Sequence, residues 1–194
     1  YAARPSKRLV RFMAKKATFD HKISGPLMRS MRHIPVDRSA GAGSLDHAVE
    51  WLRKGEVVGV FPEATISQSF EVKDFKTGAV RMAAEAGVPV VPMITFGGQR
   101  LWTKGRKREM TRGTLVALTV GEPISVTTQD DPVEATAHLR SVMQDLYDQT
   151  IEAYEPKPAP GAWWWPARYG GAAPTLQEMR EQEARDRAAR ETGD

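Results

Sequence analysis

Residues 57–67 read VVGVFPEATIS, and the clearest evidence for the fold class lies in these eleven residues. Its first part, 57–61, is a β-branched apolar run with the length of a buried strand. The run ends abruptly at Pro62 and Glu63, and a polar loop with hydroxyl side chains follows. Loops at the carboxyl ends of strands are where α/β proteins place binding and catalytic residues. A carboxylate delivered there by a buried strand marks a candidate functional site.

Strands and helices alternate on both sides of this stretch. Downstream, a helix is predicted over 78–86, stopped by Gly87, and the apolar run 88–96 is predicted to be the next buried strand. Such a strand, helix and strand unit favours a parallel sheet with a right-handed crossover. The upstream elements predicted by the same patterns are a strand over 9–14, a short helix opened by Gly25-Pro26, a strand over 33–36 and a helix from Ser44 to Gly55. The fold class is therefore α/β, with a mixed, largely parallel sheet flanked by helices.

The C-terminal half ends in an extension of different composition. A strand is predicted over 114–120, and Asp131-Pro132 begins a long helix, so residues 1–155 are predicted to form one domain. Residues 156–174 are rich in Pro, Trp and Gly and are interpreted as a linker, or as a clasp that docks Trp163, Trp164 and Trp165 on the domain or in a lipid interface. Residues 175–194 are highly charged and are predicted to be an exposed helix or disordered.

Charge and composition narrow the classes of partner. The 194 residues include no Cys and carry a net charge of +4, and no run approaches the roughly 18 apolar residues of a membrane-spanning helix. Ten Lys or Arg residues lie within 1–38 against two Asp, and a second basic stretch with Trp102 lies within 100–112. Such surfaces suit phosphate-bearing partners: lipid head groups, the phosphopantetheine of an acyl carrier, or nucleic acid. Nucleic acid binding would leave the Glu63 loop unexplained, so no nucleic acid partner is predicted.

Four motifs in the same order carry a family resemblance. The Glu63 stretch resembles the Phe-Pro-Glu-Gly-Thr-Arg-Ser signature of glycerolipid acyltransferases. The other three matches are Gly25-Pro26-Leu27 followed by Ile34-Pro35-Val36-Asp37-Arg38, then Phe75-Lys76-Thr77-Gly78, then Val88-Pro89-Val90-Val91-Pro92. Over roughly residues 8–123 the chain thus resembles the bacterial lysophospholipid acyltransferases that convert 1-acylglycerol-3-phosphate to phosphatidic acid.

The resemblance implies a general base that this sequence does not contain. In the family, a His-x-x-x-x-Asp motif orients an imidazole that deprotonates the acceptor hydroxyl. The residues five positions after the four histidines are Pro26, Arg38, Leu52 and Met143, and none is an acid. We therefore expect the catalytic pair to precede Tyr1, so that no catalytic residue is present here and the 194 residues alone show little acyl transfer.

The resemblance also implies a substrate site, two of whose positions depart from the family pattern. The implied substrate-binding residues are Arg38, Phe61, Pro62, Glu63, Thr65, Ser67, Lys76 and Gly78. Ala64 replaces a family Gly, and Ile66 replaces the family Arg expected to contact the acceptor phosphate. That contact would then be weakened, or shifted to Arg38, Lys73 or Lys76. No metal or bound cofactor is implied, and acyl-CoA or acyl-carrier protein would be the acyl donor.

Each implied role has a structural alternative. Arg38 would otherwise be a solvated loop residue paired with Asp37, and Glu63 a helix cap or an ordinary loop carboxylate. Hydroxyls such as those of Thr65 and Ser67 commonly stabilise their own loop, and Gly78 would serve close packing. The implied location is the cytoplasmic face of the cell membrane, as a peripheral protein. Two rival functions stay open: a non-catalytic lipid- or phosphate-binding protein, and an acyltransferase for another lysophospholipid.

Overall fold

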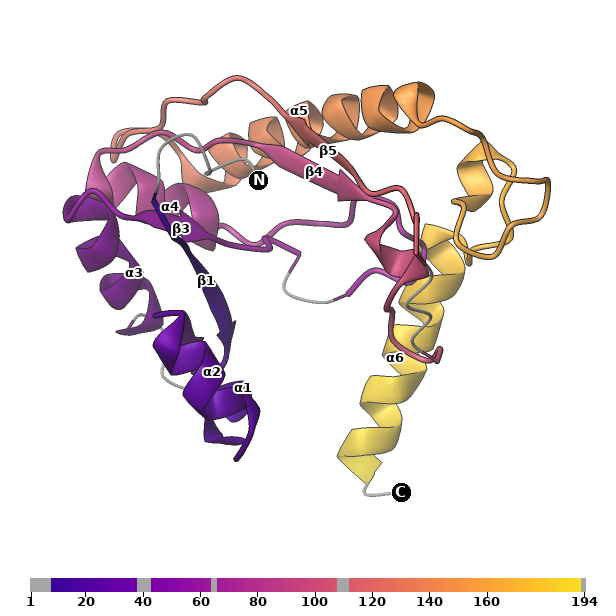
Figure 1. Cartoon of the computed structure of the whole chain (residues 1–194). Coiled ribbons are helices and arrows are strands. Elements are labelled where there is room, and N and C mark those ends of the chain that lie inside the picture. Colours follow the sequence, from indigo (N-terminus) through magenta and orange to yellow (C-terminus); the bar gives the residue numbers. More distant parts are fainter. Residues whose placement is uncertain (1–7, 38–42, 64–65, 108–111, 193–194) are drawn as a thin grey trace. The chain divides into compact units, whose positions relative to one another are not determined.

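A computed structural model describes residues 8–37, 43–63, 66–107 and 112–192 of the chain. The chain forms two compact units (Figure 1). We call the first, made of 1–64, 75–92 and 122–139, the parallel-sheet unit. The second, made of 65–74, 93–121 and 140–194, is the aromatic unit. The domain boundaries predicted at 155 and 174 stay predictions.

The parallel-sheet unit is built on three strands, β1 (Val10–Lys15), β2 (Ile34–Val36) and β3 (Val57–Gly59). Their order is β2-β1-β3, and both pairings are parallel, with Phe12 opposite Gly59 and Lys15 opposite Val36. This arrangement confirms the α/β class and its parallel sheet. Because parallel strands end at the same edge, the loops after β2 and β3 leave the sheet on the same side.

Helices α3 (Gly43–Arg53) and α4 (Gly78–Ala86) build the core of this unit together with β2. One cluster of buried residues consists of Ile34, Ala48, Val49 and Met82, each exposed by 3% or less. Apolar side chains at helical spacing in α3 and α4 explain why these two faces are buried. Gly87 ends α4 with a φ of 68°, a left-handed conformation that glycine adopts without strain. Both helices were predicted from the sequence.

The predicted strand over 88–96 is wrong in its extent, its burial and its partner. Only Met93–Phe96 forms a strand, β4, and it pairs antiparallel with β5 (Ala117–Val120) in a separate two-stranded sheet. Val90 makes a single bridge to Ile124. Pro89 and Pro92 have no backbone N–H to donate, so they interrupt a continuous ladder. Burial in β4 alternates, and only Ile94 and Phe96 are buried.

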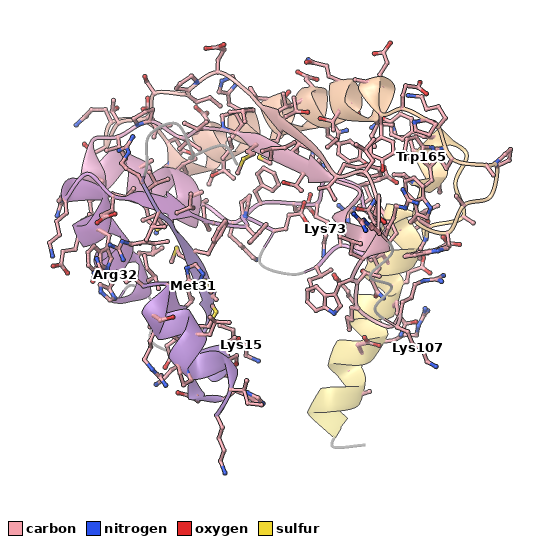
Figure 2. The ribbon with its side chains drawn as sticks, viewed as in Figure 1. Lys15, Met31, Arg32, Lys73, Lys107 and Trp165 are labelled. Atoms are coloured by element: carbon pink, nitrogen blue, oxygen red, sulfur yellow. The ribbon has the colours of Figure 1, made fainter. Side chains whose placement is uncertain are left out.

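The aromatic unit has a core of rings around Phe96. The ring centroid of Phe96 lies 5.4 Å from that of Tyr154, 5.5 Å from Trp165 and 6.1 Å from Tyr147. The Tyr154 hydroxyl also donates to the backbone oxygen of Leu115 at 2.9 Å. The tryptophan triplet, Trp163 to Trp165, therefore packs on its own unit. Trp165, labelled in Figure 2, is only 5% exposed.

Three short helical segments follow strands: α1 (Lys16–Asp20) and α2 (Ser24–Ser30) come after β1, and η2 (Gly98–Arg100) comes after β4. The long helix α5 (Pro132–Ala153) begins in the first unit and continues in the second. Its start is capped by Asp131, whose Oδ1 accepts the N–H groups of Val133 at 2.8 Å and Glu134 at 2.9 Å.

The chain then passes through η3 (Ala167–Tyr169) to α6 (Leu176–Thr192). A reciprocal cap begins α6: the N–H of Thr175 donates to Glu178 at 2.8 Å, and that of Glu178 to Thr175 Oγ1 at 3.2 Å. The charged terminal segment is thus helical. Within the described ranges, no helix has both the length and the apolar character needed to cross a membrane.

Candidate functional site

The Glu63 turn follows β3 directly. Residues 60–62 continue the chain past the sheet, and both Pro62 and Glu63 are half-buried. The Phe61 ring is 71% exposed and stacks on Phe12 of β1, with centroids 5.9 Å apart. The segment after β3 therefore presents an aromatic ring and a carboxylate two positions apart in the sequence.

The start of α4 is tied to this turn by a backbone hydrogen bond. The N–H of Lys76 donates to the oxygen of Pro62 at 2.9 Å. The Lys76 side chain is exposed, and the next residue, Thr77, occupies the N-cap of α4 without a side-chain cap hydrogen bond. The first turn of α4 also contains no acidic residue. Lys76 and the N-terminus of α4, which is the positive end of the helix dipole, thus lie beside the Pro62-Glu63 turn. Together they provide positive charge that suits the binding of an anionic group.

Gly78, the first residue of α4, is not required for close packing. A Cβ added there would meet Leu45 Cδ2 at 3.5 Å, which is an ordinary van der Waals contact. The packing alternative for this glycine is therefore unsupported by the geometry, whereas its predicted binding role stays a prediction.

Two predicted site residues, Arg38 and Thr65, lie outside the described residues. The preceding residue, Asp37, follows β2 and pairs with Lys16, Nζ to Oδ2 at 3.2 Å. Since β2 and β3 are both parallel to β1, the chain leading to Arg38 leaves the sheet at the edge where the Glu63 turn begins. The described chain thus leaves β2 and β3 at the same edge of the sheet, and the substrate-binding roles implied for Arg38 and Glu63 stay predictions.

The remaining predicted residue, Ser67, belongs to the aromatic unit. Its Oγ lies 2.8 Å from Ser69 Oγ and 3.6 Å from the Met179 sulfur on α6. Nearby, Lys73 Nζ contacts Glu183 of α6 at 2.7 Å, and the Lys73 side chain is only 11% exposed. These contacts match the loop-stabilising alternative for Ser67 and give Lys73 a partner within its own unit.

The basic stretch after β4 uses several of its cations internally. The Arg100 guanidinium carbon lies 4.4 Å from the ring centroid of Trp164, and that of Arg106 lies 4.1 Å from Trp163. Lys104 contacts Asp186 at 3.6 Å. Cations over aromatic rings are stabilised by the ring quadrupole. This stretch therefore helps to attach the tryptophan triplet and α6 to the aromatic unit.

Sequence reasoning missed Phe12, which stacks on Phe61 ahead of the turn, and His33, which contacts Phe12. The Phe12 N–H donates to His33 Nδ1 at 3.1 Å, and the two rings meet edge to face with centroids 5.8 Å apart. A Cβ at Gly59 would lie 2.6 Å from Phe12 Cε1, so the ring can cover β3 only because residue 59 is glycine. A glycine inside a β-branched run was the available signal, because it marks a close approach.

Comparisons with known proteins bear most directly on the parallel-sheet unit. Residues 1–95 match the family model described as Acyltransferase. A 1-acyl-sn-glycerol-3-phosphate acyltransferase of Bacillus subtilis (strain 168) is 33% identical over 119 residues, which are 59% of this chain and 54% of that protein. One of Limnanthes douglasii is 30% identical over 145 residues, covering 73% of this chain and 50% of that protein. The chain thus spans about half the length of these relatives.

A solved structure agrees with the fold. It is the crystal structure of the 1-acyl-sn-glycerophosphate (LPA) acyltransferase PlsC from Thermotoga maritima, with a TM-score of 0.61 and 23% identity. The match covers 77% of this chain and 59% of that one. A carboxylate turn at the end of a parallel strand, the ordered motifs around it and the matching family model agree: residues 1–95 of this chain belong to the acyltransferase family.

Proposed function

We propose that the whole protein transfers a fatty acyl group from acyl-CoA or acyl-carrier protein to 1-acylglycerol-3-phosphate. The product would be phosphatidic acid, an intermediate of phospholipid biosynthesis, made at the cytoplasmic face of the membrane by a peripheral enzyme. The names of the relatives support the acceptor. The observation that carries the proposal is the hydrogen bond from Lys76 to Pro62, which joins the Glu63 turn to the cationic start of α4.

In this proposal the acceptor is held from two sides. The Glu63 carboxylate accepts hydrogen bonds from the glycerol backbone, while Lys76, the amides at the start of α4 and Arg38 hold the phosphate. Phe61 and Pro62 keep the turn in place next to the substrate. Holding the free hydroxyl in a fixed orientation is itself a large contribution to rate, because it removes the entropy cost of alignment.

The chemical step is an attack of the acceptor hydroxyl on the thioester carbonyl carbon. A general base takes the hydroxyl proton, the new ester C–O bond forms and the C–S bond breaks. The protonated base then gives its proton to the leaving sulfur, so the carrier is released as its thiol. No covalent enzyme intermediate is required. We propose that the base is the histidine of a His-x-x-x-x-Asp pair ahead of Tyr1, which the reading frame upstream of Tyr1 tests directly.

Glu63→Ala in the whole protein tests the proposal. We expect kcat/KM for phosphatidic acid formation to fall about 100-fold or more, because the acceptor loses its orienting partner. Radiolabelled acyl-CoA and 1-acylglycerol-3-phosphate give the readout. Glu85→Ala is the control, since Glu85 is a half-exposed residue of α4 that pairs with Arg53 at 3.5 Å. Normal turnover by Glu63→Ala would refute the assigned role.

A second candidate is an acyltransferase for another lysophospholipid, and Ile66 favours it. This side chain is 48% exposed and apolar where the family pattern has an arginine. Comparing lysophosphatidic acid with lysophosphatidylcholine and lysophosphatidylglycerol as acceptors separates the two candidates. Should the upstream frame contain no His-x-x-x-x-Asp pair, the non-catalytic lipid- or phosphate-binding alternative would take precedence.

A further inference from the structure

The α1–α2 hairpin, residues 15–32, exposes an apolar stripe. Ile23, Leu27 and Met31 are exposed by 82%, 58% and 39%. Their spacing of four residues puts them on one face of α2 and its two flanking residues. A single exposed apolar side chain is ordinary, but three on one face form a patch of the kind that marks an interaction surface.

Hydrogen bonds between α2 and α1 fix the position of the helix that carries this stripe. Ser24 Oγ donates to the oxygen of Thr18 at 2.8 Å, and Arg29 Nη1 donates to the oxygen of Phe19 at 2.8 Å. A Cβ on Gly25 would lie 2.2 Å from that same Phe19 oxygen, so glycine is what allows α2 to approach α1. The Phe19 side chain is 5% exposed and anchors the hairpin. The stripe therefore lies on an attached helix.

Positive charge is concentrated around the stripe. Residues 15–32 contain five Lys or Arg residues and one Asp, so this segment alone has the net charge of +4 that the whole chain carries. The five are Lys15, Lys16, Lys22, Arg29 and Arg32, all of them exposed, and Lys16 also pairs with Asp37. Lys15, Met31 and Arg32 are labelled in Figure 2, all on the part of the ribbon that holds β1, α1 and α2.

This combination fits a lipid surface better than a protein partner. Burying five cations against another protein segment would require a partner for each, because unpaired buried charges are costly. At an anionic bilayer, Ile23 and Leu27 can enter the acyl boundary while lysine and arginine stems extend to the lipid phosphates. The basic stretch around Arg100 and Arg106 differs, because those cations lie on tryptophans of their own unit.

We propose that the α1–α2 hairpin is the surface by which the protein docks on an anionic membrane, with Ile23, Leu27 and Met31 inserted between the head groups. The inference deepens the proposed function by naming the surface that brings the enzyme to its lipid acceptor. Its readout is binding and not acyl transfer, so either proposal can fail while the other stands.

A single-cysteine probe tests the insertion, because the chain has no cysteine of its own. Leu27→Cys carrying an environment-sensitive fluorophore is mixed with phosphatidylcholine vesicles that contain or lack phosphatidylglycerol. Val133→Cys is the matched control, since Val133 is 68% exposed at the start of α5. We expect a blue shift at position 27 with the anionic vesicles only, and none at position 133. Equal responses at both positions, or a response at position 27 to an acidic carrier protein but not to vesicles, would overturn the proposal.

Charge reversal tests the cationic rim. Lys15→Glu with Lys22→Glu is expected to lower the partition coefficient on anionic vesicles about tenfold or more, since each surface cation contributes about a few-fold. Lys107→Glu with Arg112→Glu, two exposed cations of the aromatic unit, makes the same change in net charge. This second pair should lower the partition coefficient on anionic vesicles much less. If both pairs lower it equally, only net charge matters and the hairpin is not the docking surface. Circular dichroism checks that each variant folds.

Discussion

The two units of this chain are stabilised by different kinds of core. In the parallel-sheet unit, small and aliphatic side chains of neighbouring elements pack together, as Ile34 does with Val49 and Met82. In the aromatic unit, Phe96 packs on rings that lie 51 to 69 positions later in the sequence, from Tyr147 to Trp165. The first core is built from regular periodic elements, whereas the second is built by distant aromatic contacts around a two-stranded sheet.

The difference extends to the charged groups. In the parallel-sheet unit, Arg11 is 1% exposed and donates to Glu56 at 2.8 Å and to the oxygen of Arg32 at 3.2 Å. Its guanidinium also lies 3.9 Å from the Trp51 ring centroid. In the aromatic unit, the corresponding buried ion is a carboxylate, Glu71, which is 9% exposed. One unit thus buries a cation that has hydrogen-bond partners, and the other buries an acid.

The largest effect is expected from Phe96→Ala. The ring is 2% exposed, so its removal leaves a cavity among the aromatic rings and should lower the free energy of unfolding by about 3–5 kcal/mol. Chemical denaturation followed by tryptophan fluorescence gives the measurement. Phe61→Ala removes a 71% exposed ring and should cost less than about 1 kcal/mol. Equal losses for the two variants would mean that the aromatic cluster is not the core of its unit.

A smaller effect is expected from Arg11→Leu in the parallel-sheet unit. The substitution keeps apolar contact but leaves Glu56 and the Arg32 oxygen without this donor, at a cost of about 2 kcal/mol. Arg53→Leu breaks an exposed pair with Glu85 and should cost less than about 0.5 kcal/mol. Thermal unfolding of both variants measures the difference. If Arg11→Leu proves neutral, the buried cation adds nothing to this core.

The smallest effects on stability are expected from substituting two glutamates, Glu56 and Glu71, and the two effects should have opposite signs. The hydrogen bond and charge of Arg11 lower the pKa of Glu56, so its contribution to stability is present at neutral pH and is lost as pH falls below the ordinary glutamate range. Burial raises the pKa of Glu71, so its contribution is present in acid and is lost as pH rises through that raised pKa.

The two residues can be separated by amide substitution. At pH 7, Glu56→Gln should lower the melting temperature, whereas Glu71→Gln should raise it, because glutamine needs no ionisation in a buried position. Both differences should shrink toward acidic pH, as the native carboxyl groups become protonated. Melting curves at pH 7 and pH 4 provide the check. Shifts of the same sign at pH 7 would contradict the assignment of one favourable and one unfavourable carboxylate.

Much of the candidate site could be predicted from the sequence because its signals are local. An apolar run that ends at Pro62-Glu63 predicts a carboxylate after a strand, and the order of the motifs predicts that the start of α4 belongs with it. The hydrogen bond between Lys76 and Pro62 agrees with that prediction. The neighbourhood of Phe12, Gly59 and His33 was not predicted, because only strand pairing brings these residues together.

The helices and the parallel-sheet class could be predicted from local sequence, since helix spacing, glycine stops and proline positions act within a few residues, and the ordered motifs indicated the family. Helices α3, α4 and α5 thus end or begin where Gly55, Gly87 and Asp131-Pro132 predict. In contrast, the pairing of β4 with β5 outside the parallel sheet and the packing of Trp165 on Phe96 became known only from the folded chain. The reason is physical: a strand's hydrogen bonds and a ring's neighbours are supplied by residues far along the chain, and local pattern does not specify which ones.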